Sequence, residues 1–173
     1  MKLLPKILLG VVGVLVVIQV VRPDHVNPPV TGAIKAPPEV QALLKRSCFD
    51  CHSNETTWPW YSQIAPVSWL VARDVKEGRK HLNFSEWEGY EAARKAKKLE
   101  GVAGEVDEGG MPMEIYLPMH PEAKLSQGDR KVLVDWAKAG NAPPAPPPRP
   151  EAAAPPPPCA CSPGRPPGPA WLC

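Results

Sequence analysis

The chain of 173 residues carries 20 Lys and Arg against 18 Asp and Glu, a formal charge of +2. This balance excludes the concentrated basic face of a nucleic-acid-binding protein, so no nucleic acid is expected among its partners. An apolar beginning and a proline-rich end leave about one modest domain between them. The basic runs "EGRKH" and "ARKAKK" are interrupted by other residues and are interpreted as solvated helix faces.

The first 22 residues have the pattern of a signal anchor or a signal peptide. Lys2 and Lys6 form a basic start, and residues 7–21 are an apolar run broken only by Gln19. A helix over that run is about 22 Å long against about 30 Å of hydrocarbon, so two preceding leucines bring it close to spanning. No small-residue cleavage site follows directly, which favours an uncleaved membrane helix. The lysines then predict a bacterial inner-membrane protein whose domain faces the periplasm.

The next segment, residues 23–38, contains repeated prolines and is predicted to be an extended tether. A first helix is then predicted from Glu39, because Val40, Leu43 and Leu44 recur at helical spacing. This helix is expected to run into the "CFDCH" motif.

A second helix is predicted over residues 66–78, with Pro66 in its first turn and Gly78 as its stop signal. Three apolar residues are expected on its buried side: Trp69, Leu70 and Val75.

A third helix is predicted over residues 85–101. Ser85 followed by Glu88 has the capping-box spacing, and Gly101 would end the helix. Residues 101–125 are rich in glycine and then punctuated by proline, so an extended loop is expected there.

A fourth helix is predicted over residues 126–140, with Ser126 as N-cap, Asp129 in the first turn and Gly140 at the end. Its inward residues are expected to be Val132, Leu133 and Trp136. No strand alternation occurs, so the fold class is all-α, with about four helices and long loops over residues 39–140. Residues 141–173 are Pro- and Ala-rich and are predicted to be a disordered tail with incidental cysteines: Cys159, Cys161 and Cys173.

The central motif is Cys48-Phe49-Asp50-Cys51-His52. A redox dithiol would need a strand–helix–strand setting, and a zinc site would need a second ligand pair. Neither is found in the predicted domain. Two thiols at this spacing, followed at once by an imidazole, are typical of covalent haem c attachment, with His52 as the proximal ligand. An exported location agrees, because c-type haem is attached outside the cytoplasm.

The sixth iron ligand is expected from the loop after residue 101. Met111 is the first choice, because two glycines precede it and Pro112 stiffens the chain after it. Met113, Met119 and His120 are the rivals, and any of these methionines could instead fill the core. His81 and His25 are interpreted as histidines without a role at the iron.

Several segments of the chain resemble the bacterial haem-binding domain family, which is related to c-type cytochromes. The resemblance covers about residues 39–138 and includes these elements: the Cys48/Cys51/His52 motif, Tyr61…Ile64-Ala65-Pro66…Trp69, Leu82-Asn83-Phe84-Ser85…Trp87, Met111-Pro112 and His120-Pro121-Glu122-Ala123-Lys124-Leu125. Met113 stands where such proteins usually have a second proline, which adds a competing thioether. The resemblance implies a mono-haem c-type fold and leaves the reaction open.

The expected function is one-electron transfer by a membrane-tethered cytochrome with one covalent haem c, because filled axial positions favour electron transfer over ligand chemistry. Redox proteins would be its partners, and an electron carrier is favoured over an enzyme. Two alternatives remain at this stage: a haem-based sensor or ligand-binding domain, and a peroxidase-like role or accessory domain to a haem peroxidase.

Overall fold

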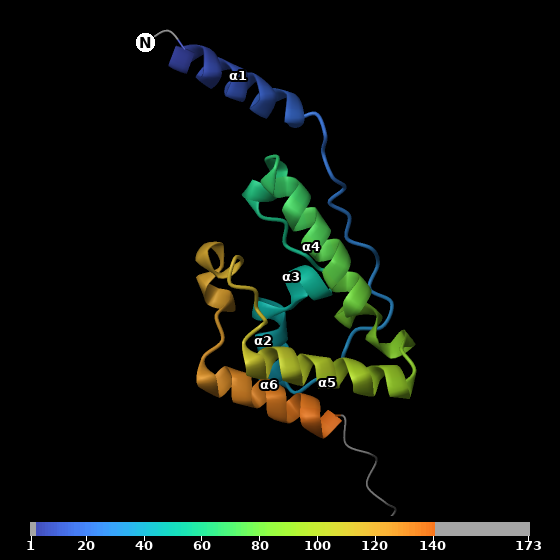
Figure 1. Cartoon of the computed structure of the whole chain (residues 1–173). Coiled ribbons are helices and arrows are strands. Elements are labelled where there is room, and N and C mark those ends of the chain that lie inside the picture. The colour runs from blue at the N-terminus through green and yellow to red at the C-terminus, as the bar shows by residue number, and fades with distance from the viewer. Residues whose placement is uncertain (1–2, 141–173) are drawn as a thin grey trace, which may run out of the picture. The chain divides into compact units, whose positions relative to one another are not determined.

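The computed structural model describes residues 3–140, and within them it contains only helical regular structure (Figure 1). The α-helices are α1 (Leu3–Ile18), α2 (Pro38–Ser47), α3 (Phe49–His52), α4 (Val67–His81), α5 (Ala92–Glu108) and α6 (Gln127–Gly140). Short 3₁₀ segments lie between them: η1 (Trp60–Gln63), η2 (Phe84–Gly89), η3 (Leu117–Met119) and η4 (Pro121–Ala123). The all-α prediction is confirmed, and the predicted tail lies outside the described residues.

The core is built where α2, α5 and α6 meet. Figure 1 shows α5 and α6 lying side by side, and α2 packs against α6. The predicted apolar face of α2 is confirmed, because Val40, Leu43 and Leu44 are all buried. Leu44 and Leu133 are fully buried in the same cluster, so the helix before the cysteine motif is anchored to the last helix of the domain.

The start of α6 follows the predicted capping pattern. The Ser126 Oγ accepts a hydrogen bond from the Asp129 backbone N at 3.1 Å, and Asp129 Oδ2 accepts one from the Ser126 backbone N at 2.9 Å. This reciprocal pair satisfies two donors that a helix start leaves free. Of the residues predicted to point inward, Leu133 is fully buried, while Val132 and Trp136 are half-buried against the core.

Helix α4 extends beyond its predicted end and turns a different face to the core. It continues through Gly78 to His81, so Gly78 is an interior residue and the predicted stop was wrong. Val75 is buried as expected, but Trp69 and Leu70 are 37% and 42% exposed. Trp69 and Leu70, in the first turn of α4, therefore belong to an exposed apolar surface rather than to the core.

The prediction for the third helix was wrong at both ends. Ser85 lies in η2 rather than at a helix start, because its hydroxyl accepts a hydrogen bond from the Asn54 backbone N at 2.9 Å. Helix α5 begins only at Ala92 and runs through Gly101 to Glu108. It ends at Gly109, whose φ of 80° is left-handed and suits glycine. The first residues assigned to the extended loop are thus the last turns of α5.

Part of the predicted tether is packed into the domain. Ile34 is 3% exposed within the core cluster. The Thr31 and Gly32 backbone N atoms both donate to the Ser85 carbonyl, and the Ile34 N donates to the Phe84 carbonyl. Residues 31–34 therefore pack against η2 as part of the domain itself.

Helix α1 covers 16 residues of the predicted membrane segment, and most of its large apolar side chains are exposed. Across residues 3–140, none of the helices combines the length and the apolar character needed to cross a bilayer.

Candidate functional site

The cysteine motif folds into one tight turn. Helix α2 ends just before Cys48, whose carbonyl accepts from the backbone N atoms of Cys51 at 3.3 Å and His52 at 2.9 Å. Between them, Phe49 points into the core and stacks on Phe84 with ring centres 5.6 Å apart. This anchor leaves Cys48, Cys51 and His52 free to line one cavity of about 660 Å³, a volume typical of ligand sites.

The imidazole of His52 is oriented by two backbone carbonyls. Its Nδ1 lies 2.9 Å from the Gly78 oxygen and 3.2 Å from the Leu82 oxygen. Because carbonyls only accept, Nδ1 carries the proton and donates it, which leaves the lone pair on Nε2. Burial lowers the pKa of His52, so the ring stays neutral. A metal-ligating histidine needs this tautomer and this kind of support.

Gly78 lets α4 approach the motif closely. A Cβ built on Gly78 would lie 2.5 Å from the Cys51 carbonyl oxygen and 3.2 Å from the Cys51 Cβ. No side chain fits in that space without moving the backbone. The same residue supplies one of the carbonyls that hold His52, so the contact between α3 and α4 positions both the thiol and the imidazole.

The two thiols are unpaired and protonated. Both cysteines are free, and burial together with the neighbouring Cys51 raises the pKa of Cys48 to about 12. Burial and the carboxylates of Asp50 and Asp74 raise the pKa of Cys51 to about 11. Neither thiol has the lowered pKa of a redox-active thiolate, which speaks against the dithiol alternative.

Arg79 fixes the chain on the other side of the motif. Its guanidinium donates to Ser53 O at 2.7 Å, Val26 O at 2.8 Å, Asn27 Oδ1 at 2.7 Å and Thr56 Oγ1 at 2.9 Å. Sequence reasoning missed this residue, because its four acceptors are distant in the chain and two of them are backbone atoms. Arg79 therefore ties the N-terminal segment to the residues that follow His52.

Helix α5 forms the opposite wall of the cavity. It turns one stripe toward the cavity, at spacings of three and four residues: Arg94, Lys97, Lys98, Gly101, Val102, Glu105 and Val106. A Cβ built on Gly101 would meet nothing within 4 Å, so the middle of this wall is bare backbone. Arg94 and Lys97 are exposed, as expected for a solvated face, whereas Lys98 is half-buried, and all three also line the cavity.

Two substitutions at Gly101 are expected to separate the stability of the polypeptide from its capacity for a cofactor. Gly101→Ala should stabilise the cofactor-free chain by about 1 kcal/mol, because glycine is a poor helix former. Gly101→Leu should instead lower the haem content, because its side chain enters the cavity. Chemical unfolding and the haem-to-protein absorbance ratio measure the two effects.

The matched control is Gly104→Leu. A Cβ built on Gly104 also meets nothing within 4 Å, and Gly104 lies outside the cavity wall. Equal haem loading of Gly101→Leu and the unchanged chain would contradict this role.

The four candidates for the sixth ligand occupy different places. Met111 and Met113 line the same cavity as His52, and the Met111 N donates to the Glu105 carbonyl at 3.1 Å. Met119 lines a second cavity, together with Met113. His120 lines neither of the two cavities. Its Nε2 lies 2.7 Å from the Tyr61 hydroxyl and its Nδ1 3.1 Å from the Glu122 carboxylate, so both ring nitrogens have partners.

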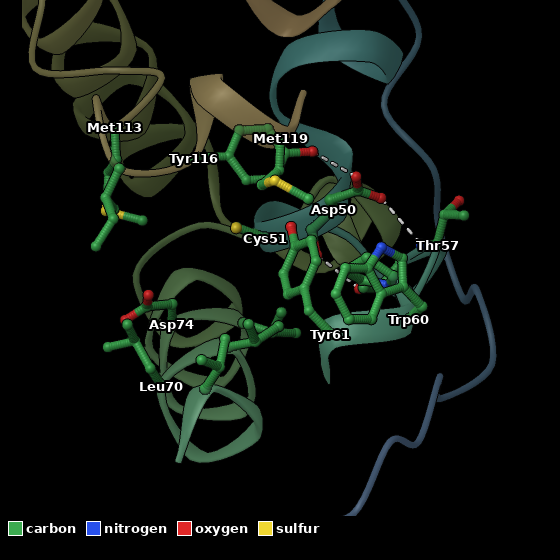
Figure 2. Close-up of a pocket in the computed structure, with 16 residues that line it drawn as sticks. Asp50, Cys51, Thr57, Trp60, Tyr61, Leu70, Asp74, Met113, Tyr116 and Met119 are labelled. Atoms are coloured by element: carbon green, nitrogen blue, oxygen red, sulfur yellow. Dashed lines mark hydrogen bonds between the residues drawn. The ribbon is translucent and has the colours of Figure 1, made fainter. Parts of the chain in front are cut away.

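The second cavity has a volume of about 460 Å³ and shares lining residues with the first. Figure 2 shows the side chains that line this second cavity. Cys51, Met113 and Tyr116 line both cavities. The Tyr116 hydroxyl donates to Asp50 Oδ2 at 2.6 Å, a bond that Figure 2 shows at the cavity wall. Most of the remaining lining is apolar, and Trp60 is 68% exposed at its edge. The space beside Cys51 is thus continuous with an exposed apolar surface.

The domain is all-α, and its large cavity is lined by two thiols, a supported imidazole and two thioethers. These features define a candidate haem protein. A sequence model of the haem-binding domain family matches residues 13–139, and the chain belongs to that family. The resemblance stated from the sequence is confirmed, and haem is the cofactor. No curated protein and no solved structure matches the chain.

The residues of the larger cavity fit a haem. The imidazole of His52 offers a free Nε2, two neutral thiols stand beside it, and the bare backbone at Gly101 leaves room for a flat ring. Met111 and Met113 place two thioether sulfurs in the lining of the same cavity, and a thioether is a ligand type that haem iron accepts.

Proposed function

We propose that this protein holds one haem covalently through Cys48 and Cys51 and carries single electrons, with His52 and Met111 as axial ligands. The observation that carries the proposal is that all four side chains line one cavity. The haem would supply the one-electron change between ferric and ferrous iron. Each neutral thiol would add its S–H across one vinyl group, so no atom would be lost and the haem would stay bound after denaturation.

The protein part of this function is to hold the ligands and exclude water. The Gly78 and Leu82 carbonyls keep the His52 ring in one orientation, which is a requirement for a stable axial ligand. Met111 lies on the loop after α5, held at its backbone by Glu105. Filling both axial positions favours electron transfer, and a Met ligand raises the reduction potential relative to a second His.

We also propose that the domain works outside the cytoplasm, tethered to the inner membrane of a bacterium by its first 22 residues. The basic start and the apolar run of residues 7–21 support this, together with the exported location in which c-type haem is attached. Soluble or membrane-bound redox proteins are the partners that this arrangement would serve.

The intact mass of the denatured full-length chain tests covalent attachment, after production in a bacterium that matures c-type cytochromes. The expected mass is the polypeptide plus one haem. Cys48→Ala/Cys51→Ala should give the bare polypeptide, because no thioether can form. The matched control, Cys159→Ala/Cys161→Ala, removes two cysteines of the tail and should retain the haem. A bare mass for the unchanged chain, or covalent haem on the Cys48→Ala/Cys51→Ala variant, would refute the proposal.

A further inference from the structure

The wall that α5 contributes to the haem cavity is basic at one end only. Arg94, Lys97 and Lys98 all line the cavity near the N-terminal end of the helix. Gly101 and Val102 follow on the same face and carry no charge. The basic side chains are therefore grouped at one edge of the cavity.

Tyr90 holds two of these cations together. The Arg94 guanidinium carbon lies 5.0 Å, and the Lys98 Nζ 4.6 Å, from the centre of the Tyr90 ring. The ring is itself fixed, because its hydroxyl accepts from the Asn83 backbone N at 3.2 Å and it packs edge-on against Trp87. Burial, and then repulsion from Arg94, lowers the pKa of Lys98. Two like charges held this close favour an anion beside them.

No protein anion takes that place within residues 3–140. None of the three cations forms an ion pair there, whereas Lys95, on the same helix and outside the cavity, pairs with Glu88 at 3.0 Å. The acidic residues that line the cavity come from three helices: Asp50 from α3, Asp74 and Glu77 from α4, and Glu105 from further along α5. The three cations are therefore grouped at the N-terminal end of α5 without a carboxylate partner among the described residues, and an anionic group of a ligand is directed to them.

Haem carries two propionate carboxylates, on the edge opposite its two vinyl groups. We infer that Arg94, Lys97 and Lys98 bind these two carboxylates, with Tyr90 as the positioning residue for Arg94 and Lys98. The orientation rests on the proposed function, because thioethers at Cys48 and Cys51 hold the vinyl edge. The attraction between the three cations and the two carboxylates requires only that haem enters this cavity, with or without thioether bonds. The basic edge of α5 thus determines which way round the porphyrin lies.

The test compares two porphyrins that differ only in these carboxylates. Ferric haem and its dimethyl ester are titrated into the full chain carrying Cys48→Ala/Cys51→Ala, which prevents covalent capture, and the two Kd values are measured by absorbance. Haem is expected to bind more tightly than the ester. Lys98→Gln should reduce that preference about fivefold, and Arg94→Gln or Lys97→Gln about twofold to fivefold, because exposed ion pairs are weak.

Lys95→Gln is the matched control, because it removes the same charge from the same helix outside the cavity. Its preference for haem over the ester should stay within twofold of the parent. Equal Kd values for haem and ester in the parent overturn the inference. The inference also fails if Lys95→Gln reduces the preference for haem over the ester as much as Lys98→Gln does. Because this chain has no motif cysteines, the result does not depend on whether haem is covalently attached.

A second measurement applies if the cysteine-free chain binds neither porphyrin. In the mature full chain, Arg94→Gln and Lys98→Gln should lower the midpoint potential, because losing a nearby positive charge favours ferric iron. The decrease should shrink as salt is added. A shift of the same size in Lys95→Gln, or no shift in Lys98→Gln at low salt, overturns the inference.

Discussion

Gly78→Ala is expected to destabilise the domain by about 1–2 kcal/mol and to reduce its haem content. The added methyl group would lie 2.5 Å from the Cys51 carbonyl oxygen, so α4 must move away from the cysteine motif. Overpacking of this kind costs about 1–3 kcal/mol or more, which exceeds the gain of about 1 kcal/mol from better helix propensity. The shift also displaces the Gly78 carbonyl from His52 Nδ1.

Denaturant unfolding of the cofactor-free chain and the haem-to-protein ratio of the mature protein measure this effect. Gly104→Ala is the control, because Gly104 is also inside a helix and a Cβ there meets nothing within 4 Å. That variant should be as stable as the unchanged chain or slightly more stable. If Gly78→Ala behaves like Gly104→Ala, the close packing of α4 on Cys51 does not position the site.

Met111→Ala is expected to abolish the near-infrared band that a sulfur-ligated ferric haem shows. The reduction potential should fall by on the order of 0.1 V, a modest part of the roughly 0.8 V range that axial ligands set. The iron should become high-spin and bind carbon monoxide rapidly, because the sixth position is then open. Absorption spectra, redox titration and carbon monoxide mixing report these changes.

Met113→Ala and Met119→Ala serve as controls and should retain the sulfur band. Met113 lines the same cavity as Met111, whereas Met119 lines only the second one. If the band survives in Met111→Ala and disappears in Met113→Ala, the ligand is Met113. Carbon monoxide binding to the unchanged protein would instead favour the sensor or ligand-binding alternative.

Local patterns in the sequence predicted some helices well. The apolar spacing of α2 and the reciprocal cap of α6 depend on residues within four positions of one another, and the structure contains both. These are the cases in which neighbouring side chains determine the local conformation. The structure also brings Cys48, Cys51 and His52 to one cavity, while their role in haem attachment stays a prediction.

The predictions that were wrong concern glycines and residues with distant partners. Gly78 and Gly101 both resemble helix ends in the sequence, yet one makes room for the Cys51 backbone and the other leaves the cavity wall bare. Ser85 resembled a helix cap, but its hydroxyl serves Asn54. A single sequence does not contain these contacts, because their partners are brought together only by the fold.

The packing of the N-terminal segment has a practical consequence for anyone preparing a fragment of this protein. A chain cut at residue 39, where the helical pattern starts, would lose Ile34 from the core and two of the four acceptors of Arg79, Val26 O and Asn27 Oδ1. Losing a buried Ile side chain alone costs on the order of 2–5 kcal/mol, much of the stability of a small domain. A fragment suited to crystallisation or spectroscopy should therefore begin before Val26.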